Sequence, residues 1–269
     1  MKMYPFRLGT TSYIIPDDIL PNVRFLADKV QDVQLVLFEV DDGPNNLPSR
    51  GVVAELAALA DAHALTFTVH LPLDLRLGAE GEEADITLVK ARRVIDCTLP
   101  LHPWAYVLHL DGRELRDPSG GGFPPEGTPE VKAWQERSAR ALEIVGGWAG
   151  GLEKLAVENL ENYPPGFILP VLDRASVSRC VDVGHLWLDG HDPIPHLRQA
   201  LPRTRVVHLH GVAGRDHQSL AHAPAERLHP VIRTLVQENY PGVLTLEVFN
   251  EDDFHSSMAA LERAVAGIL

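Results

Sequence analysis

Eight short apolar runs alternate with amphipathic segments along the 269 residues of the chain. The runs are rich in Val, Leu and Ile and do not alternate cleanly with polar residues, as expected of parallel strands buried on both faces. They are RLGTTSYI, VQLVLFEVDD, TFTVHLP, AYVLHLDG, KLAVENLEN, SRCVDVGHL, RVVHLHG and VLTLEVFN. A strand-helix unit that repeats eight times predicts an α/β fold with one (β/α)8 TIM barrel over residues 1–269.

Segments with helical spacing of apolar residues separate these runs. Those expected to form helices are residues 50–64, with Ser49 as the N-cap, and residues 82–98, 130–149, 165–177, 224–239 and 254–268. Residues 193–201 are short, and Pro21 interrupts residues 17–30, so these two helices are less regular. A doubly wound open sheet is the alternative, but GTTSY after the first run lacks the glycine spacing of a dinucleotide-binding turn.

One segment departs from the strand-helix rhythm. Residues 111–128 contain three consecutive glycines and several prolines, and they predict a long loop without secondary structure. The loop follows the fourth run and therefore lies on the mouth side of the barrel. Loops of this length serve as lids or binding loops, or are disordered, and the sequence leaves these alternatives open.

Histidine and acidic residues recur where the apolar runs end. The carboxyl ends of all strands of a (β/α)8 barrel open into one mouth, where active sites lie. The residues that this register would gather are His70, His109, Glu158, Asp182, His185, His208 and Glu247. A single buried histidine is usually a satisfied core group, but seven such groups at strand ends are hard to ascribe to coincidence. The pattern predicts a metal site.

Mixed carboxylate and imidazole donors suit zinc, manganese or iron better than calcium, which prefers oxygen alone. One cation could be held by the residues that end the fifth to eighth runs: Glu158, Asp182, His208 and Glu247. His70 and His109 end the third and fourth runs and could hold a second cation, with Glu158 as a bridge. Two cations roughly 3.5–4 Å apart can clamp a phosphate and activate a bridging water.

Polar residues near the sixth and seventh runs extend this set. His185 could hold a third ion with Asp216 and His217, or could contact substrate instead. Asp216 could equally cap its loop or pair with the neighbouring Arg215. His210 lies on the same side of its strand as His208 and could support a ligand or contact substrate.

Three aromatic residues lie near the expected mouth. Tyr13, Trp187 and Phe249 could stack on a flat ring or on a sugar face. Ordinary packing at the rim of the barrel is the simpler interpretation of each.

Charge and cysteine content narrow the class of protein. The net charge of −13 and the lack of a Lys and Arg stripe argue against long nucleic acid as a partner. Two cysteines are too few for a disulfide framework or a thiolate zinc site, and they indicate a reducing compartment. The segment MKMYPFRLGTTSY lacks the apolar core of a signal peptide, and no apolar run reaches membrane-spanning length. We therefore expect a cytoplasmic protein without a membrane partner.

The order of these strand-end residues, and the VDVGH and HLHG segments in particular, resembles the xylose-isomerase-like barrel superfamily. That superfamily includes sugar isomerases and epimerases as well as zinc-dependent apurinic endonucleases. Resemblance to the ketose epimerases implies one metal, held by Glu158, Asp182, His208 and Glu247, with the two glutamates moving protons. Resemblance to the endonucleases implies a second ion at His70 and His109, and phosphoester chemistry.

The endonuclease resemblance also implies a third ion, bound by His185 and by an Asp and a His of the following loop. One residue separates that Asp and His in the endonucleases, whereas Asp216 and His217 are adjacent here. Either the loop is rebuilt in this chain or the third ion is absent.

A closer resemblance involves RLGTTSYIIPDDILPNV and HLHGVAGRDHQSL, which look like segments of the cobamide-remodelling phosphodiesterases. It implies a small-molecule substrate, a cobamide such as cobalamin, whose nucleotide-loop phosphodiester is hydrolysed to α-ribazole and cobinamide phosphate. The expected cofactors are two or three divalent ions, namely zinc, manganese or iron. The expected catalytic residues are Glu158, Glu247, His185 and His217. The alternatives are a single-metal ketose isomerase or epimerase and a non-catalytic cobamide- or sugar-binding barrel.

Overall fold

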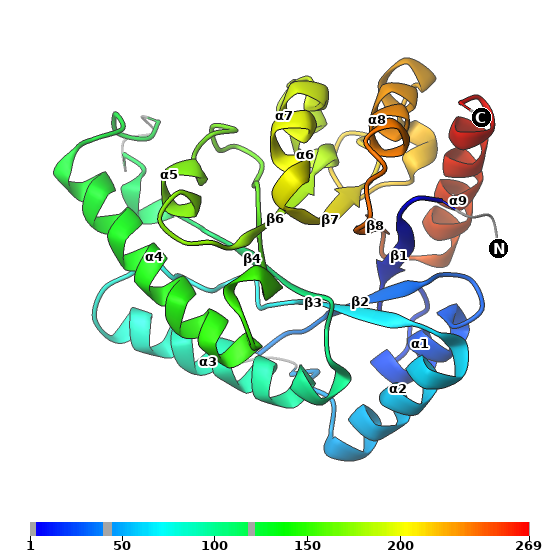
Figure 1. The fold of residues 1–269 in the computed structure, drawn as a ribbon, viewed down its shortest axis with the longest axis horizontal. Helices are drawn as coiled ribbons and strands as arrows, with labels where there is room; N and C mark the ends of the chain where they lie inside the picture. The colour runs from blue at the N-terminus through cyan, green and yellow to red at the C-terminus, as the bar shows by residue number, and fades with distance from the viewer. Residues whose placement is uncertain (1–3, 40–44, 118–121, 269) are drawn as a thin grey trace.

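The computed structural model describes residues 4–39, 45–117 and 122–268, and it contains a closed barrel of parallel strands (Figure 1). The strands are β1 (Arg7–Thr11), β2 (Asp32–Val36), β3 (Thr66–His70), β4 (Ala105–His109), β5 (Leu155–Glu158), β6 (Ser178–Asp182), β7 (Thr204–Leu209) and β8 (Val243–Leu246). Each strand pairs with the next along the chain, and β1 pairs with β8 to close the barrel. All eight strands coincide with the predicted runs, so the TIM-barrel prediction is confirmed.

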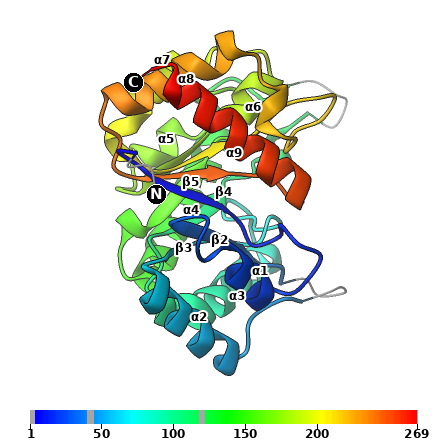
Figure 2. The ribbon, with the colours of Figure 1, turned by 90° about the vertical axis from the view of Figure 1, so that its right-hand side faces the viewer.

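The helices are α1 (Ile19–Leu26), α2 (Arg50–His63), α3 (Glu82–Thr98), α4 (Pro129–Ala149), α5 (Leu169–Leu172), α6 (Val183–Leu188), α7 (Pro193–Ala200), α8 (Ala225–Gln237) and α9 (Glu251–Ala266). Figure 2 shows α1, α2 and α3 on one side of the barrel and α7 and α8 on the opposite side. Ser49 caps α2 as expected, since its hydroxyl accepts a hydrogen bond from the Val52 amide at 3.3 Å. Pro21 lies in the first turn of α1, where a helix tolerates proline because those amides have no intrahelical partner.

Two predictions about helices were wrong. The helix expected over residues 165–177 is only α5, because Pro165 and Pro170 restrict the backbone on either side of its start. Helix α6 was not predicted. Its six residues VGHLWL are mostly apolar, and so short a run reads as a continuation of the preceding strand.

Residues 111–117 and 122–128 of the predicted loop contain one short 3-10 element and otherwise neither helix nor strand; residues 118–121 lie outside the described residues. A 3-10 turn covers Arg113–Leu115. The Phe123 ring lies 4.8 Å from the rings of Tyr163 and Phe167, and the Arg116 guanidinium lies over Phe123 at 4.6 Å. These contacts fasten the segment to the loop that follows β5.

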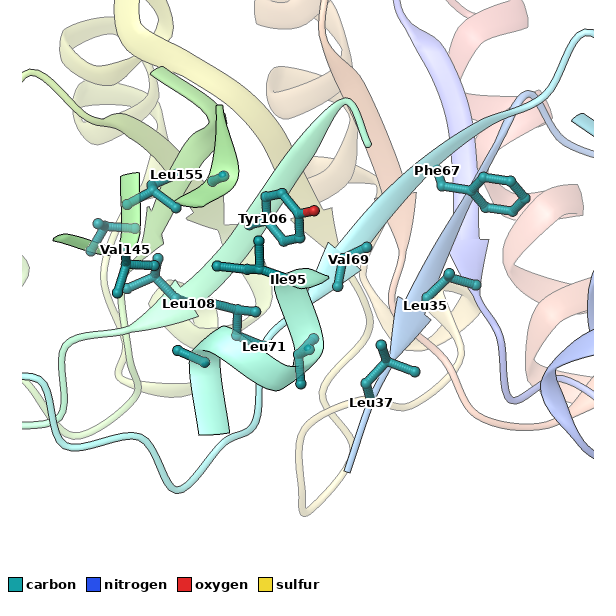
Figure 3. Packing of buried hydrophobic residues seen from close by; sticks show 14 of the residues in the cluster. Leu35, Leu37, Phe67, Val69, Leu71, Ile95, Tyr106, Leu108, Val145 and Leu155 are labelled. Carbon is teal, nitrogen blue, oxygen red and sulfur yellow. The ribbon is translucent and has the colours of Figure 1, made fainter. Parts of the chain in front are cut away.

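Two layers of apolar side chains hold the strands in place. Small and medium residues fill the inside of the barrel beneath the mouth: Ala105, Val107, Ala156, Cys180 and Val206. The larger layer lies between the strands and the helices, and Figure 3 shows Val69 and Leu108 near Ile95 of α3 in this layer. Because such interiors are close-packed, the ends of the strands form a rigid platform for side chains. No helix among the described residues is long and apolar enough to cross a membrane.

Candidate metal centre

Four neighbouring strands bring one group of donors together at the mouth. Glu158 and Asp182 are the last residues of β5 and β6, His208 lies in β7, and Glu247 directly follows β8. Asp182 pairs with His208 in the sheet register. One donor atom from each residue lies within 4.8 Å of the others, and all four residues are buried. We call Glu158, Asp182, His208 and Glu247 the quartet.

A second group adjoins the quartet and shares Glu158 with it. The Nε2 atoms of His70 and His109 both lie 3.3 Å from Glu158 Oε2. The Nδ1 atom of His70 lies 2.7 Å from the Leu71 carbonyl, to which it can donate, so its Nε2 faces Glu158. Donor atoms of His70, His109 and Glu158 lie within 4.8 Å of one another, and we call these three residues the His70 group.

A third group shares Asp182 with the quartet. It comprises Asp182, His185, His210 and His217, whose donor atoms also lie within 4.8 Å of one another. Asp182 caps α6 by accepting a hydrogen bond from the His185 amide at 2.6 Å. Asp216, which was expected here, stands slightly apart: its Oδ2 atom lies 4.0 Å from His185 Nε2. We call these four residues the His210 group.

In the described part of the chain, the carboxylates of the site have histidines as their basic partners. Among the described residues, every ion pair of Glu158, Asp182 and Glu247 is made with an imidazole, never with Lys or Arg. Burial opposes the charge on each group, yet the mutual attraction prevails. It holds the pKa of Glu158 and of Glu247 well below, and the pKa of His208 well above, their usual values.

The imidazoles of the His210 group behave in the same way. Burial alone would lower the pKa of His185, but the charges of Asp182 and other carboxylates raise it to about 9. Burial likewise opposes the charge of His217, while the Glu247 carboxylate, whose Oε2 atom lies 3.4 Å from His217 Nε2, helps to raise its pKa to about 10. Protons thus supply the positive charge that these carboxylates require, and a divalent cation would supply it at the same place.

Several donor atoms are buried without completing a hydrogen bond, namely Asp182 Oδ2, Glu247 Oε2 and His210 Nε2. Buried polar atoms are nearly always satisfied in native proteins, so orphaned lone pairs that converge on one place fit metal ligands. The three groups of donors therefore could hold divalent metal ions, and oxygen and nitrogen donors in this mixture suit zinc, manganese or iron.

Sequence reasoning missed Gln34, a fully buried residue in the middle of β2. Its Oε1 atom lies 2.8 Å from His208 Nε2, and its Nε2 atom lies 3.4 Å from Glu247 Oε1. The first contact fixes the His208 tautomer and leaves Nδ1 to face the carboxylates. A lone amide inside the apolar run VQLVL was the signal that could have revealed it.

The residues expected to contact substrate lie in different surroundings. Tyr13 receives a hydrogen bond from Asn46 at 2.8 Å and lines a cavity of about 460 Å³. Phe249 is 42% exposed and meets the edge of His217 at 5.5 Å between ring centroids. Trp187 is buried in the apolar cluster on the outside of the barrel, beside Arg227. His210 is fully buried within the His210 group.

Solved structures with the same fold include sugar epimerases and an endonuclease. A D-tagatose 3-epimerase-like protein is 19% identical, with a TM-score of 0.75 over 97% of this chain and 98% of that one. Endonuclease IV from Thermus thermophilus is 18% identical, with a TM-score of 0.70 over 96% and 99% of the two chains. The 3-keto-D-glucoside 4-epimerase from E. coli is 16% identical, with a TM-score of 0.70 over 97% and 99%. At these identities the likeness concerns the fold.

The sequence itself matches no curated protein. Residues 29–267, which include every donor of the three groups, match the family described as "Xylose isomerase-like TIM barrel". The chain therefore belongs to the xylose isomerase-like TIM barrel family.

Proposed function

We propose that this protein is a metal-dependent phosphodiesterase that hydrolyses the nucleotide-loop phosphodiester of cobamides to α-ribazole and cobinamide phosphate. The observation that carries the phosphodiesterase proposal is the His70 group beside the quartet. A sugar epimerase needs one cation, whereas two adjoining cations suit an in-line displacement at phosphorus. Glu158, shared by both groups, has its two carboxylate oxygens facing different imidazoles: Oε2 faces His70 and His109, and Oε1 faces His208.

The ions, when bound, would neutralise the phosphodiester and make a water molecule nucleophilic at neutral pH. Glu158 and Asp182 would hold neighbouring ions at a fixed spacing, because both end strands of the rigid barrel. Glu247 would orient its ligand partners through its contacts with His208 and His217. His185 is buried beside Asp182 and His217 is partly exposed, and each would either bind a further ion or protonate the leaving oxygen.

The choice of a cobamide as the substrate is supported by sequence. The segments RLGTTSYIIPDDILPNV and HLHGVAGRDHQSL resemble those of cobamide-remodelling phosphodiesterases. The second segment supplies His208, His210 and His217, so the resemblance includes residues of the site itself. The net charge of −13 also favours a small substrate over a long polyanion.

The test is incubation of the zinc- or manganese-loaded protein with adenosylcobalamin under anaerobic conditions, followed by mass spectrometry. We expect α-ribazole and cobinamide phosphate in equal amounts, and their loss in a Glu158→Ala variant. His63→Ala is the matched control, because His63 is an exposed residue at the end of α2. Intact cobalamin in the presence of fully metal-loaded protein, with each metal in turn, would rule out the cobamide proposal.

A second candidate is a ketose epimerase with one metal at the quartet. Likeness to the D-tagatose 3-epimerase-like protein favours it, since the fold agrees over nearly the whole chain. Glu158 and Glu247 would then carry protons to and from the sugar. Epimerisation of D-tagatose or D-fructose by protein with one bound ion, unaffected by His70→Ala, would establish this candidate instead.

A further inference from the structure

We infer that His210, rather than Asp216, completes a third cation site together with Asp182, His185 and His217. The inference rests on the proposed multi-metal function and specifies its ligands. The endonuclease resemblance implies an Asp and a His from the loop after β7 as ligands of the third ion. In this chain His217 lies in that loop, and we assign the remaining ligand to His210, which directly follows β7.

The distances favour His210 over Asp216. His210 Nε2 lies 3.3 Å from Asp182 Oδ1, in the interior of the site. Asp216 Oδ2 lies 4.0 Å from His185 Nε2, and the Asp216 side chain is 32% exposed. Donor atoms of His210 and the other three residues all lie within 4.8 Å of one another.

His210 is also an unsatisfied buried group. The residue is fully buried, and its Nε2 atom completes no hydrogen bond. Its Nδ1 atom accepts a hydrogen bond from the His217 amide at 3.0 Å and lies 3.1 Å from the Gly211 carbonyl. Cation binding at Nε2 would place the ring proton on Nδ1, which would then donate to the Gly211 carbonyl instead of accepting from the His217 amide. A ring nitrogen that donates to a carbonyl is typical of metal-bound histidines.

Two glycines make room for this arrangement. A Cβ atom at Gly184 would lie 2.1 Å from Cε1 of the His210 ring, so only glycine allows α6 to pack beside that ring. A Cβ atom at Gly211 would lie 2.0 Å from the Ser219 carbonyl oxygen. Gly211 and Gln218 exchange two backbone hydrogen bonds of 2.8 and 3.1 Å, which close the loop into a short hairpin.

The hairpin holds His217 over His210. His217 has a left-handed backbone conformation with φ of 50°, which is uncommon for a residue other than glycine. Its ring stacks on His210 with 4.4 Å between centroids. Asp216 Oδ2 lies 3.2 Å from His217 Nδ1, so the carboxylate can fix that ring while Nε2 faces the site. Asp216 is thereby a positioning residue for His217 and not a ligand.

The two carboxylate oxygens of Asp182 connect this site to the quartet. Oδ1 faces His210 at 3.3 Å, and Oδ2 lies 3.7 Å from His208 Nδ1. The third site thus offers three imidazole nitrogens and one carboxylate oxygen, whereas the quartet offers three carboxylates and one imidazole. Nitrogen-rich sites with four ligands suit Zn²⁺, Co²⁺ or Fe²⁺, and oxygen-rich sites accept Mn²⁺ more readily. The third site should therefore fill with Co²⁺ or Zn²⁺ but poorly with Mn²⁺.

The test compares His210→Ala and Asp216→Asn in the full-length chain. Metal-free protein is loaded with Co²⁺ and desalted, and bound metal is measured by mass spectrometry and by visible absorption. We expect His210→Ala and His210→Gln to lose one equivalent and the absorption of a four-coordinate, nitrogen-rich ion. Asp216→Asn should keep that equivalent, with affinity reduced by about 10-fold. Circular dichroism and retention of the other ions establish that the variants are folded.

Two outcomes would overturn the inference. If Asp216→Asn loses the equivalent and the His210 variants keep it, Asp216 is the ligand. If all variants bind as many ions as the unaltered protein, His210 binds none. Metal content does not depend on any substrate, so a protein that binds the third ion but leaves cobalamin intact would count against the cobamide proposal alone.

Discussion

The two ends of the barrel both bury charge, but they balance it differently. At the end where the strands begin, the buried Asp32 is attracted to Arg7, and the guanidinium groups of Arg7 and Arg205 each lie 3.9 Å from the ring centroid of Trp104. At the mouth, Glu158, Asp182 and Glu247 have only imidazoles as basic partners among the described residues. One end thus contains its own permanent cations, and the other requires titratable or external ones.

This difference distinguishes a structural polar cluster at the bottom of the barrel from the candidate functional cluster at the mouth. Arginine stays protonated in proteins, so the charges around Trp104 are present under all ordinary conditions. A metal ion can displace the proton of an imidazole, so the mouth could release protons and accept divalent ions. Residues at the bottom of TIM barrels generally support stability, and those at the mouth support activity.

The sharpest test of this comparison makes the same substitution at both ends. Asp182→Asn removes the carboxylate shared by the quartet and the His210 group, and we expect the proposed phosphodiesterase activity to fall by about 1,000-fold or more, with loss of bound metal. Asp32→Asn should leave activity and metal content unchanged. Hydrolysis assays and metal analysis on both variants check this. If Asp32→Asn lost as much bound metal as Asp182→Asn, the distinction between the two ends would be false.

Trp104→Ala should affect stability alone. The ring stacks between two guanidinium groups, and its Nε1 donates a hydrogen bond to the Arg205 carbonyl at 3.1 Å. We expect the free energy of unfolding to fall by about 3 kcal/mol in urea titrations. Trp148→Ala is the matched control, because Trp148 faces one guanidinium at 5.2 Å. If Trp104→Ala also depleted the bound metal, the two ends of the barrel would not be independent.

Gln34→Met should weaken metal binding without unfolding the protein. Methionine keeps the shape of the side chain but removes the acceptor that lies 2.8 Å from His208 Nε2. We expect about 10-fold to 100-fold weaker binding at the quartet, measured by competition with a chelating dye. Gln31→Met is the control, since Gln31 contacts the Leu8 amide at the start of β1. Unchanged metal affinity in Gln34→Met would mean that the contact with Gln34 does not contribute to metal binding by His208.

The smallest expected effect concerns pH and Asp32. Burial, only partly offset by Thr66, Thr68 and Arg7, raises the pKa of Asp32 to about 6. The folded state therefore binds a proton more tightly than the unfolded state, and this contribution to stability is present below about pH 4 and is lost as the pH rises through about 6. Asp32→Asn should raise the free energy of unfolding by about 1–2 kcal/mol at pH 7.5, with little change at pH 4. A gain that is the same at both pH values would contradict this explanation.

The strands were predictable because each is a compact apolar run with a polar residue at its end. The donors His70, His109, Glu158, Asp182, His208 and Glu247 could be found for the same reason, since parallel strands deliver their ends to one mouth. Helices were harder. The helix predicted over residues 165–177 rested on the spacing of apolar residues and disregarded Pro165 and Pro170. Helix α6 is shorter than the window in which helical periodicity can be detected.

The sequence alone determined the barrel and the types of donors at its mouth, because strand periodicity and strand-end chemistry are local properties of the chain. Only the tertiary structure decided which donors share a site. Gln34 and His208 are 174 residues apart, and the position of His210 beside His217 depends on the hairpin closed by Gly211 and Gln218. Such contacts arise from the closure of the sheet and from the close packing permitted by Gly184 and Gly211, and neither follows from the spacing of residues along the chain.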